Sequence, residues 1–255
     1  MNAKPLARFL YANVPGVATL RFFAKDLMAV KFAKLEYQGV CRFSAENAVI
    51  IDIGANRGQS IAAFKALGRR PTIVAFEPEP ASAARLIRHY QGDASVTIHA
   101  CALGTEPGAI TFFVPAYGWW NCDGMAAMDR DTATSWLRDP GRMYLFDESK
   151  LRVREYRIEC RTLDSFELSP SLIKLHAQGA ELAILQGAVQ TLTKHLPALM
   201  CAFATPELTC FLSKYGFHPY IYSHAGFTAG VARPPVTFTW YLTEQHLREH
   251  KFNAA

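Results

Sequence analysis

One stretch near the start of the chain restricts its possible folds most. Residues 51–60 read Ile-Asp-Ile-Gly-Ala-Asn-Arg-Gly-Gln-Ser, so an expected apolar strand at 48–53 runs into a glycine turn and a helix from about Ser60. A second apolar strand, 72–76, ends at Glu77. This order is typical of a nucleotide pocket at the carboxyl edge of a parallel sheet, where a helix start offers unpaired N–H groups. It predicts that Glu77 faces a ribose diol.

The residue between the two glycines discriminates among nucleotides. A dinucleotide fingerprint requires Gly-x-Gly-x-x-Gly so that a pyrophosphate can approach the backbone, and Asn56 stands where the second glycine should be. S-adenosylmethionine carries no phosphate, and its amino-acid end needs both donors and acceptors, which Asn56 and the charged Asp52 supply. The turn therefore predicts an S-adenosylmethionine cofactor and disfavours a nicotinamide-dependent reductase. Generic packing of a βαβ unit remains the alternative.

Composition sets the class of protein. A chain of 255 residues that is 50% hydrophobic suits one large α/β domain, or one domain with a small appendage. Its six cysteines form no C-x-x-C pair, so a zinc site and a secreted disulfide scaffold are both poor interpretations. We expect a reducing cytoplasm, with Cys101 and Cys201 as buried small hydrophobes in apolar strands.

The positive charge is confined to one end of the chain. Of the formal net charge of +5, all arises before residue 43, where seven basic residues face Asp26 and Glu36; the remainder carries 20 basic and 20 acidic residues. A general nucleic-acid-binding surface is therefore not expected.

Residues 1–45 are predicted to be a helical segment outside the α/β domain at 46–255. Their apolar residues follow a roughly helical spacing that breaks near Pro15, and no apolar run reaches the roughly 20 residues of a membrane span. Two interpretations are open. One is a basic amphipathic helix lying peripherally on the inner membrane face. The other, which we favour, is a helical cap packed on the sheet with its lysines in water. The oligomeric state is not legible.

Strands and helices alternate along the rest of the chain in the doubly wound manner of an α/β protein. Residues 115–150 interrupt this alternation as a polar, irregular loop of a length that is usually functional or disordered. The expected strands are 48–53, 72–76, 95–101, 171–176 and 198–204, the helices are 60–67, 81–90, 180–194 and 206–215, a strand at 109–114 pairs with 151–161, and 219–222 pairs with 236–242 as a closing hairpin.

Several further blocks occur in a fixed order, and with them the chain resembles the FkbM family of S-adenosylmethionine-dependent methyltransferases. The resemblance covers roughly residues 48–203. Its blocks are 51–59, Phe76-Glu77-Pro78, Ala102-Leu103-Gly104, 162–166 (Thr-Leu-Asp-Ser-Phe), Ile173-Lys174-Leu175, Gly179-Ala180-Glu181 and 185–188 (Leu-Gln-Gly-Ala).

The resemblance implies a Rossmann-like class I methyltransferase fold, with helices on both faces of a seven-stranded, mostly parallel sheet that contains one antiparallel strand. It also implies methyl transfer to an oxygen, often a hydroxyl of a sugar, a glycan, a glycolipid or a natural product. Glu77 would take the ribose, and Ala100 and Cys101 would lie beside adenine. The methionine part would be held by Asp52, Gly54, Asn56, Gly58 and Gln59, with Ser60 at the helix start.

Two positions depart from the family pattern. His176 stands where an aspartate is usual, and Ala202 where a glutamate is usual. Imidazole, with an ordinary pKa of about 6.5, is a competent base near neutral pH, so His176 could accept the acceptor's proton. Alternatively, the acids usual at these two positions orient the acceptor or bind a cation in other family members. Their replacement would then make this chain a catalytically impaired S-adenosylmethionine-binding protein. Glu181 and Lys174 are further catalytic candidates, or helix caps. No metal ligands are assigned.

The acceptor site is expected in the long loop. Trp119 and Trp120 could form a stacking face for a sugar ring, or could instead fold the loop onto the body of the protein. Asn121, Arg142 and Tyr144 are polar neighbours that could orient hydroxyl groups.

Overall fold

The computed structural model describes residues 3–21, 24, 35–43, 46–67, 70–234 and 236–249. Two compact units share the chain: unit 1 comprises Met1–Met28 and Ala109–Glu159, and unit 2 comprises Ala29–Gly108 and Cys160–Ala255. The division differs from the boundary expected at residue 45, because the N-terminal helix groups with the segment inserted after residue 108. The apolar residues Phe22, Phe23, Leu27, Met28, Val30 and Phe32 of the N-terminal segment lie outside the described residues.

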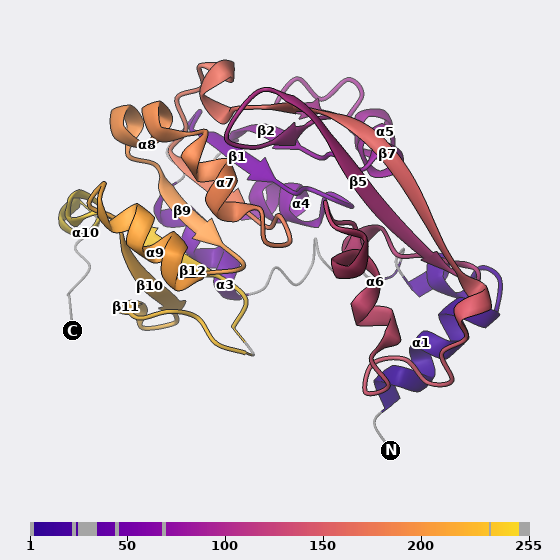
Figure 1. The fold of residues 1–255 in the computed structure, drawn as a ribbon. Helices are drawn as coiled ribbons and strands as arrows, with labels where there is room; N and C mark the ends of the chain where they lie inside the picture. Colours follow the sequence, from indigo (N-terminus) through magenta and orange to yellow (C-terminus); the bar gives the residue numbers. More distant parts are fainter. Residues whose placement is uncertain are drawn as a thin grey trace. The chain divides into compact units, whose positions relative to one another are not determined.

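Unit 2 is built on an eight-stranded sheet in the order β11-β10-β12-β9-β8-β1-β2-β3 (Figure 1). Strands β3, β2, β1, β8 and β9 are mutually parallel, which confirms the expected Rossmann-like α/β fold. Their bounds are Val49–Ile53 (β1), Thr72–Phe76 (β2), Val96–His99 (β3), Leu172–Leu175 (β8) and Ala198–Cys201 (β9).

The far edge of this sheet has one more strand than expected. Strand β12 (Thr239–Leu242) runs antiparallel to both β9 and β10 (His218–Ser223), which confirms the predicted pairing of the closing strands. The additional strand is β11 (Gly226–Ala229), which folds back on β10 through a tight turn. Gly226 has a φ of 108°, a conformation that favours glycine and permits this turn. The sheet thus has two antiparallel strands, not one.

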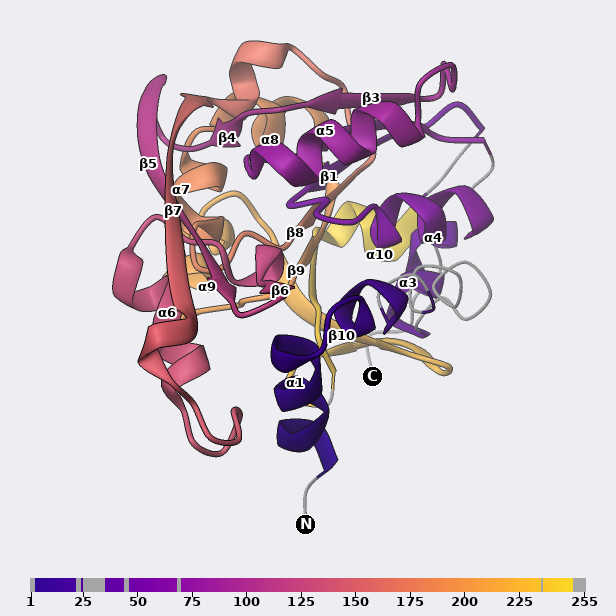
Figure 2. The ribbon, with the colours of Figure 1, turned by 90° about the vertical axis from the view of Figure 1, so that its right-hand side faces the viewer.

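Helices cover both faces of the sheet, since the central strands are apolar at successive positions and are buried on both sides (Figures 1 and 2). On one face pack α7 (Glu181–Gln186), α8 (Val189–His195) and α9 (Pro206–Ser213). On the other pack α3 (Leu35–Gln38), α4 (Gln59–Leu67), α5 (Pro80–His89) and α10 (Glu244–Glu249).

The prediction of a single helix at 180–194 is wrong, because the chain breaks at Gly187 into two helices, α7 and α8. A Cβ at Gly187 would lie 2.0 Å from the carbonyl oxygen of Gly104, so only glycine allows the two backbones to approach. The Gly187 carbonyl also accepts the Asp164 N–H at 3.1 Å. The expected strand at 95–101 is likewise shorter, and Ala102–Leu103 (β4) leaves it to pair with β7 (Leu151–Arg161).

A second, four-stranded sheet has the order β4-β7-β5-β6. The predicted pairing of 109–114 with 151–161 is confirmed by the neighbouring strands β5 (Gly108–Tyr117) and β7. The loop expected at 115–150 is not irregular throughout, because it contains β6 (Trp120–Asn121) and α6 (Arg130–Arg138). Asp129 caps α6 by accepting the Thr132 N–H at 2.7 Å.

Helix α1 (Ala3–Asn13) completes unit 1. Its Ala12 packs in one apolar cluster with Tyr117 and Trp120, and the Ala12 carbonyl accepts the Trp119 N–H at 2.9 Å. Lys150 Nζ donates to Asn13 Oδ1 at 2.7 Å. The described start of the chain is therefore a helical cap on the β5–β6 hairpin.

Within the described part of the chain, every helix is too short or too polar to cross a bilayer.

Candidate active site

The turn after β1 is held against the ends of β2 and β8, the two strands that flank β1 in the sheet. Gly54 donates its N–H to the Phe76 carbonyl at 2.9 Å, and its φ is 74°. A Cβ on Gly54 would lie 2.1 Å from the carbonyl oxygen of His176, at the end of β8. Glycine is therefore required here by both conformation and space. Gly58, with a φ of 81°, closes the turn before α4.

Beneath this turn lies a buried network of three charged or polar side chains. Asp52 is 0% exposed and accepts from Ser60 Oγ at 2.5 Å and from Lys174 Nζ at 2.8 Å. Lys174 also donates to the carbonyls of Gly54 (2.9 Å) and Ile53 (3.3 Å). The pair forms because Asp52 and Lys174 are register partners on adjacent parallel strands. These contacts indicate that Asp52, Ser60 and Lys174 position the turn from below.

Asn56 and Glu77 form the upper side of the site. Asn56 adopts a left-handed conformation (φ 46°), and its N–H donates to Glu77 Oε2 at 2.6 Å. Glu77 Oε1 accepts the Glu79 N–H at 2.9 Å. Glu77 is only 6% exposed, and this burial raises its pKa to about 7, with the two N–H donors acting in the opposite direction. Asn56 Oδ1 is buried and has no hydrogen-bond partner among the described residues.

The family resemblance implies that the adenine of the cofactor lies beside Ala100 and Cys101, which follow β3. Ala100 is exposed, whereas Cys101 is buried in the core and is 5% exposed, so Ala100 is better placed to meet a ligand. The preceding His99 stacks on Phe76 with ring centroids 5.1 Å apart. Its burial and the nearby Arg161 lower the pKa of His99, which favours a neutral imidazole. Gln59 is exposed at the first position of α4.

The two remaining catalytic candidates follow β8. Glu181 is 2% exposed and accepts the N–H groups of Ala177 (2.7 Å) and Gly179 (2.8 Å), so its contacts indicate a role in shaping the loop. His176 is half-buried at the carboxyl edge of the sheet, with its ring 5.4 Å from Phe203 and 6.1 Å from Phe238. His176 is therefore the candidate that can reach a ligand.

The residues predicted to bind the acceptor all belong to unit 1, and they differ in how far they are exposed. Trp119 is 68% exposed, but Trp120 is 7% exposed and packs edge-on against Tyr11 and Trp136. The two tryptophans therefore do not form one stacking face, and for Trp120 the alternative of folding the loop applies. Asn121 is half-buried and pairs within the β5–β6 hairpin, Arg142 forms an ion pair with Asp139 (2.9 Å), and Tyr144 is 47% exposed.

Two features of the site were missed at the sequence level. Phe203, two residues after the end of β9, is 42% exposed and lies beside His176. An apolar residue near the end of a core strand is a signal that the sequence offers. The second is the left-handed backbone conformation of Asn56, whereas the sequence pattern pointed only to its polar side chain. Asparagine tolerates the left-handed conformation better than other non-glycine residues, and this also favours it at such a turn. Among the described residues, no group of three potential ligands could hold a metal ion.

The sequence is similar to those of known methyltransferases. The sequence matches the methyltransferase FkbM domain family over residues 52–228. It is 26% identical over 183 residues to the 2-O-methyltransferase NoeI of Sinorhizobium fredii, covering 69% of this chain and 72% of the relative. It is 24% identical over 188 residues to Methyltransferase 1 of Beauveria bassiana, covering 70% and 71%.

A solved structure, a methyltransferase FkbM from Methylobacillus flagellatus KT, aligns with 76% of this chain at 16% identity and a TM-score of 0.48. The aligned part of the present chain spans 43% of that protein's length. Since the family match extends over more than half of its residues, the chain belongs to the methyltransferase FkbM domain family and is a methyltransferase.

Proposed function

We propose that the protein transfers a methyl group from S-adenosylmethionine to a hydroxyl of a sugar, a glycan, a glycolipid or a natural product. The observation that carries this proposal is the pairing of buried Glu77 with Asn56 over the turn supported by Lys174. The relative named as a 2-O-methyltransferase supports an oxygen acceptor.

The residues at the turn fit this cofactor. The buried, unpartnered Asn56 Oδ1 can accept a hydrogen bond from an ammonium group. Glu77 Oε2 accepts the Asn56 N–H and Oε1 accepts the Glu79 N–H, and each oxygen retains a lone pair for a hydroxyl of the ribose diol. The Asn56 side chain also stands at the position where a pyrophosphate would need a glycine, and this disfavours a dinucleotide.

In the mechanism we propose, S-adenosylmethionine supplies a methyl group on a sulfonium that is open to in-line displacement. Asp52, Ser60 and Lys174 fix the turn, and Glu77 and Asn56 orient the donor, because alignment of donor and acceptor is the enzyme's largest contribution to such a reaction. His176 accepts the proton of the attacking hydroxyl at the carboxyl edge of the sheet.

The proposal is tested first by calorimetric titration of the full chain with S-adenosylmethionine and, separately, with NADH. We expect saturable binding of S-adenosylmethionine alone. Binding of NADH at the same site, or no binding of either compound, would overturn the assignment.

We expect the affinity for 5′-methylthioadenosine to rise with pH. Because burial raises the pKa of Glu77 to about 7, the side chain is mostly protonated below that pH and mostly a carboxylate above it. The carboxylate accepts more hydrogen bonds from the diol, and one charged hydrogen bond of about 1.5–3 kcal/mol corresponds to roughly tenfold or more in affinity. Calorimetry at about pH 5.5 and about pH 8 measures the change, because this nucleoside lacks the titratable amino-acid end of the full cofactor.

Glu77→Gln serves as the comparison in that experiment. It should bind the nucleoside weakly and almost equally at both pH values, whereas Glu106→Gln, at an exposed position, should retain the pH dependence of the natural chain. A pH dependence that survives in Glu77→Gln would assign the titration to another group.

His176→Gln is expected to lower kcat/KM by about 10²- to 10⁴-fold, the usual contribution of a general base, without changing the affinity for S-adenosylmethionine. The measurement is transfer of labelled methyl groups to a panel of glycosides and hydroxylated extracts, with exposed His224→Gln as the control. If the natural chain methylates nothing in the panel and His176→Asp with Ala202→Glu brings no gain, the catalytically silent alternative is correct. Full activity in His176→Gln would exclude a role as the base.

A further inference from the structure

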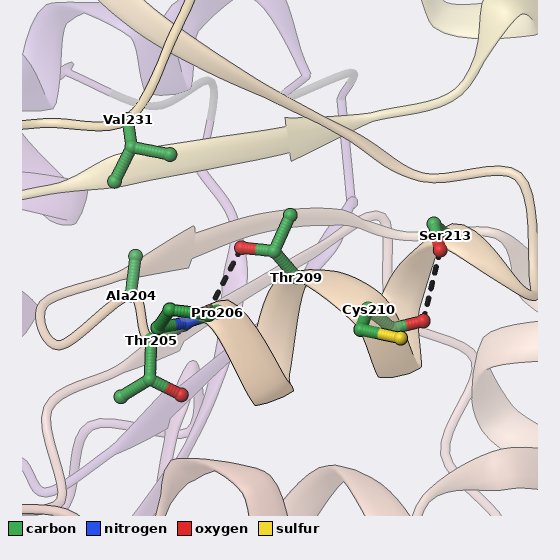
Figure 3. Close-up of a pocket in the computed structure, with 7 residues that line it drawn as sticks. All are labelled: Ala204, Thr205, Pro206, Thr209, Cys210, Ser213 and Val231. Atoms are coloured by element: carbon green, nitrogen blue, oxygen red, sulfur yellow. Dashed lines mark hydrogen bonds between the residues drawn. The ribbon is translucent and has the colours of Figure 1, made fainter.

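An open groove runs along α9 in unit 2, and none of its lining residues belongs to the turn that carries the cofactor residues. Figure 3 shows its lining side chains on α9 and on the segments that precede it and face it. The groove has a volume of about 560 Å³. It is lined by Ala204, Thr205, Pro206, Thr209, Cys210, Ser213 and Val231.

The groove offers little to a polar ligand. None of its seven lining residues is charged. Thr209 Oγ1 bonds to the Tyr241 hydroxyl at 2.7 Å and to the Thr205 carbonyl at 3.0 Å, and Ser213 Oγ donates to the Cys210 carbonyl at 2.8 Å. The Thr205 hydroxyl accepts the Leu208 N–H at 3.2 Å as the cap of α9. Because the hydroxyl groups already have partners, the surface that remains is mainly hydrocarbon.

One end of the groove meets the edge of the sheet where His176 lies. Ala204 follows Phe203, whose exposed ring stands 5.4 Å from the His176 ring. From there the groove follows α9 from Pro206 to Ser213, a length of about 10 Å at 1.5 Å per helical residue. A ligand hydroxyl placed beside His176 would thus have an apolar track leading away from it.

We propose that this groove binds an alkyl chain of the acceptor, so that the substrate is an amphiphile whose hydroxyl is presented at His176. The inference rests on the proposed function and narrows its acceptor class. An alkyl occupant is favoured over an ionic one by the uncharged lining, and over a compact sugar by the length of the track. Each methylene buried in such a groove raises affinity by up to about fourfold.

Cys210 provides a direct measure of occupancy. It is an exposed, free thiol in the groove, and Cys41 is an exposed, free thiol elsewhere in unit 2. The full chain is alkylated with iodoacetamide in the presence of octyl glucoside below its critical micelle concentration, and both sites are quantified by mass spectrometry. We expect octyl glucoside to slow alkylation of Cys210 by about fivefold when about four-fifths of the protein is occupied. Cys41 should be unaffected, hexyl glucoside should protect at higher concentration, and methyl glucoside should not protect.

Two matched variants locate the effect. Val231→Arg places a charge on the wall of the groove and should abolish protection, whereas Ile87→Arg, at another exposed apolar position of unit 2, should retain it. Equal protection of Cys210 and Cys41, or none by either alkyl glucoside, would overturn the proposal. The readout does not involve the cofactor. Loss of protection with intact S-adenosylmethionine binding refutes the groove alone, and the reverse result refutes the proposed function alone.

Discussion

Gly54→Ala is expected to lower the free energy of unfolding by about 4 kcal/mol or more and to abolish cofactor binding. The substitution places a Cβ 2.1 Å from the His176 carbonyl oxygen, at the carboxyl ends of the two central strands β1 and β8, at a φ of 74°. Neither backbone can yield easily, since β1 and β8 are hydrogen-bonded to each other and buried on both faces. Urea unfolding followed by circular dichroism gives the stability, and calorimetry gives the binding.

Gly92→Ala is the matched control for this prediction. Gly92 has a similar positive φ of 90°, but nothing lies within 4 Å of an added Cβ. Its substitution should cost about 1–2 kcal/mol, the penalty of the left-handed conformation alone, and should leave binding unchanged. Equal losses in the two variants would show that conformation, and not the approach to β8, explains the requirement for glycine.

Lys174→Met is expected to cost about 3–5 kcal/mol, because it leaves the fully buried Asp52 carboxylate without its partner. Adding Asp52→Asn removes that uncompensated charge, so the double variant should recover much of the lost stability. Its affinity for S-adenosylmethionine should nevertheless stay low, because Lys174 also holds the carbonyls of Ile53 and Gly54. Urea unfolding and calorimetry separate the two effects.

Lys65→Met makes the same chemical change at a partly exposed ion pair with Asp93. It should cost about 1 kcal/mol or less and leave binding intact. A double variant of Asp52 and Lys174 that regained full affinity would show that the pair only balances charge and does not position the turn.

Local patterns predicted the half of the fold that determines the cofactor site. β2 has the expected bounds, and β1 and α4 begin within one residue of them, because apolar runs and a glycine turn specify these elements without distant contacts. The polar turn was predictable from residues 51–60, and the carboxylate of Glu77 from its place at the end of the apolar strand 72–76. The β5–β7 pairing also followed from local strand patterns.

What escaped prediction depends on contacts between distant residues. The burial of Lys174 against Asp52 joins positions 122 residues apart, so the sequence alone suggested a lysine available to the acceptor. The break at Gly187 arises from its approach to Gly104, and the burial of Trp120 from its contact with Tyr11 on α1. Each of these is set by tertiary packing, which residue patterns do not record.

The pairing of α1 with the inserted segment has a consequence for synthesis of the chain. Arg8 and Asn13 find their partners, Arg142 and Lys150, more than 130 residues later. Unit 2 is also built from two separate stretches, the second of which begins at Cys160. Helix α1 must therefore wait for the synthesis of residues 109–159 before its apolar face is covered. Folding of both units is dominated by non-local contacts, which slow it.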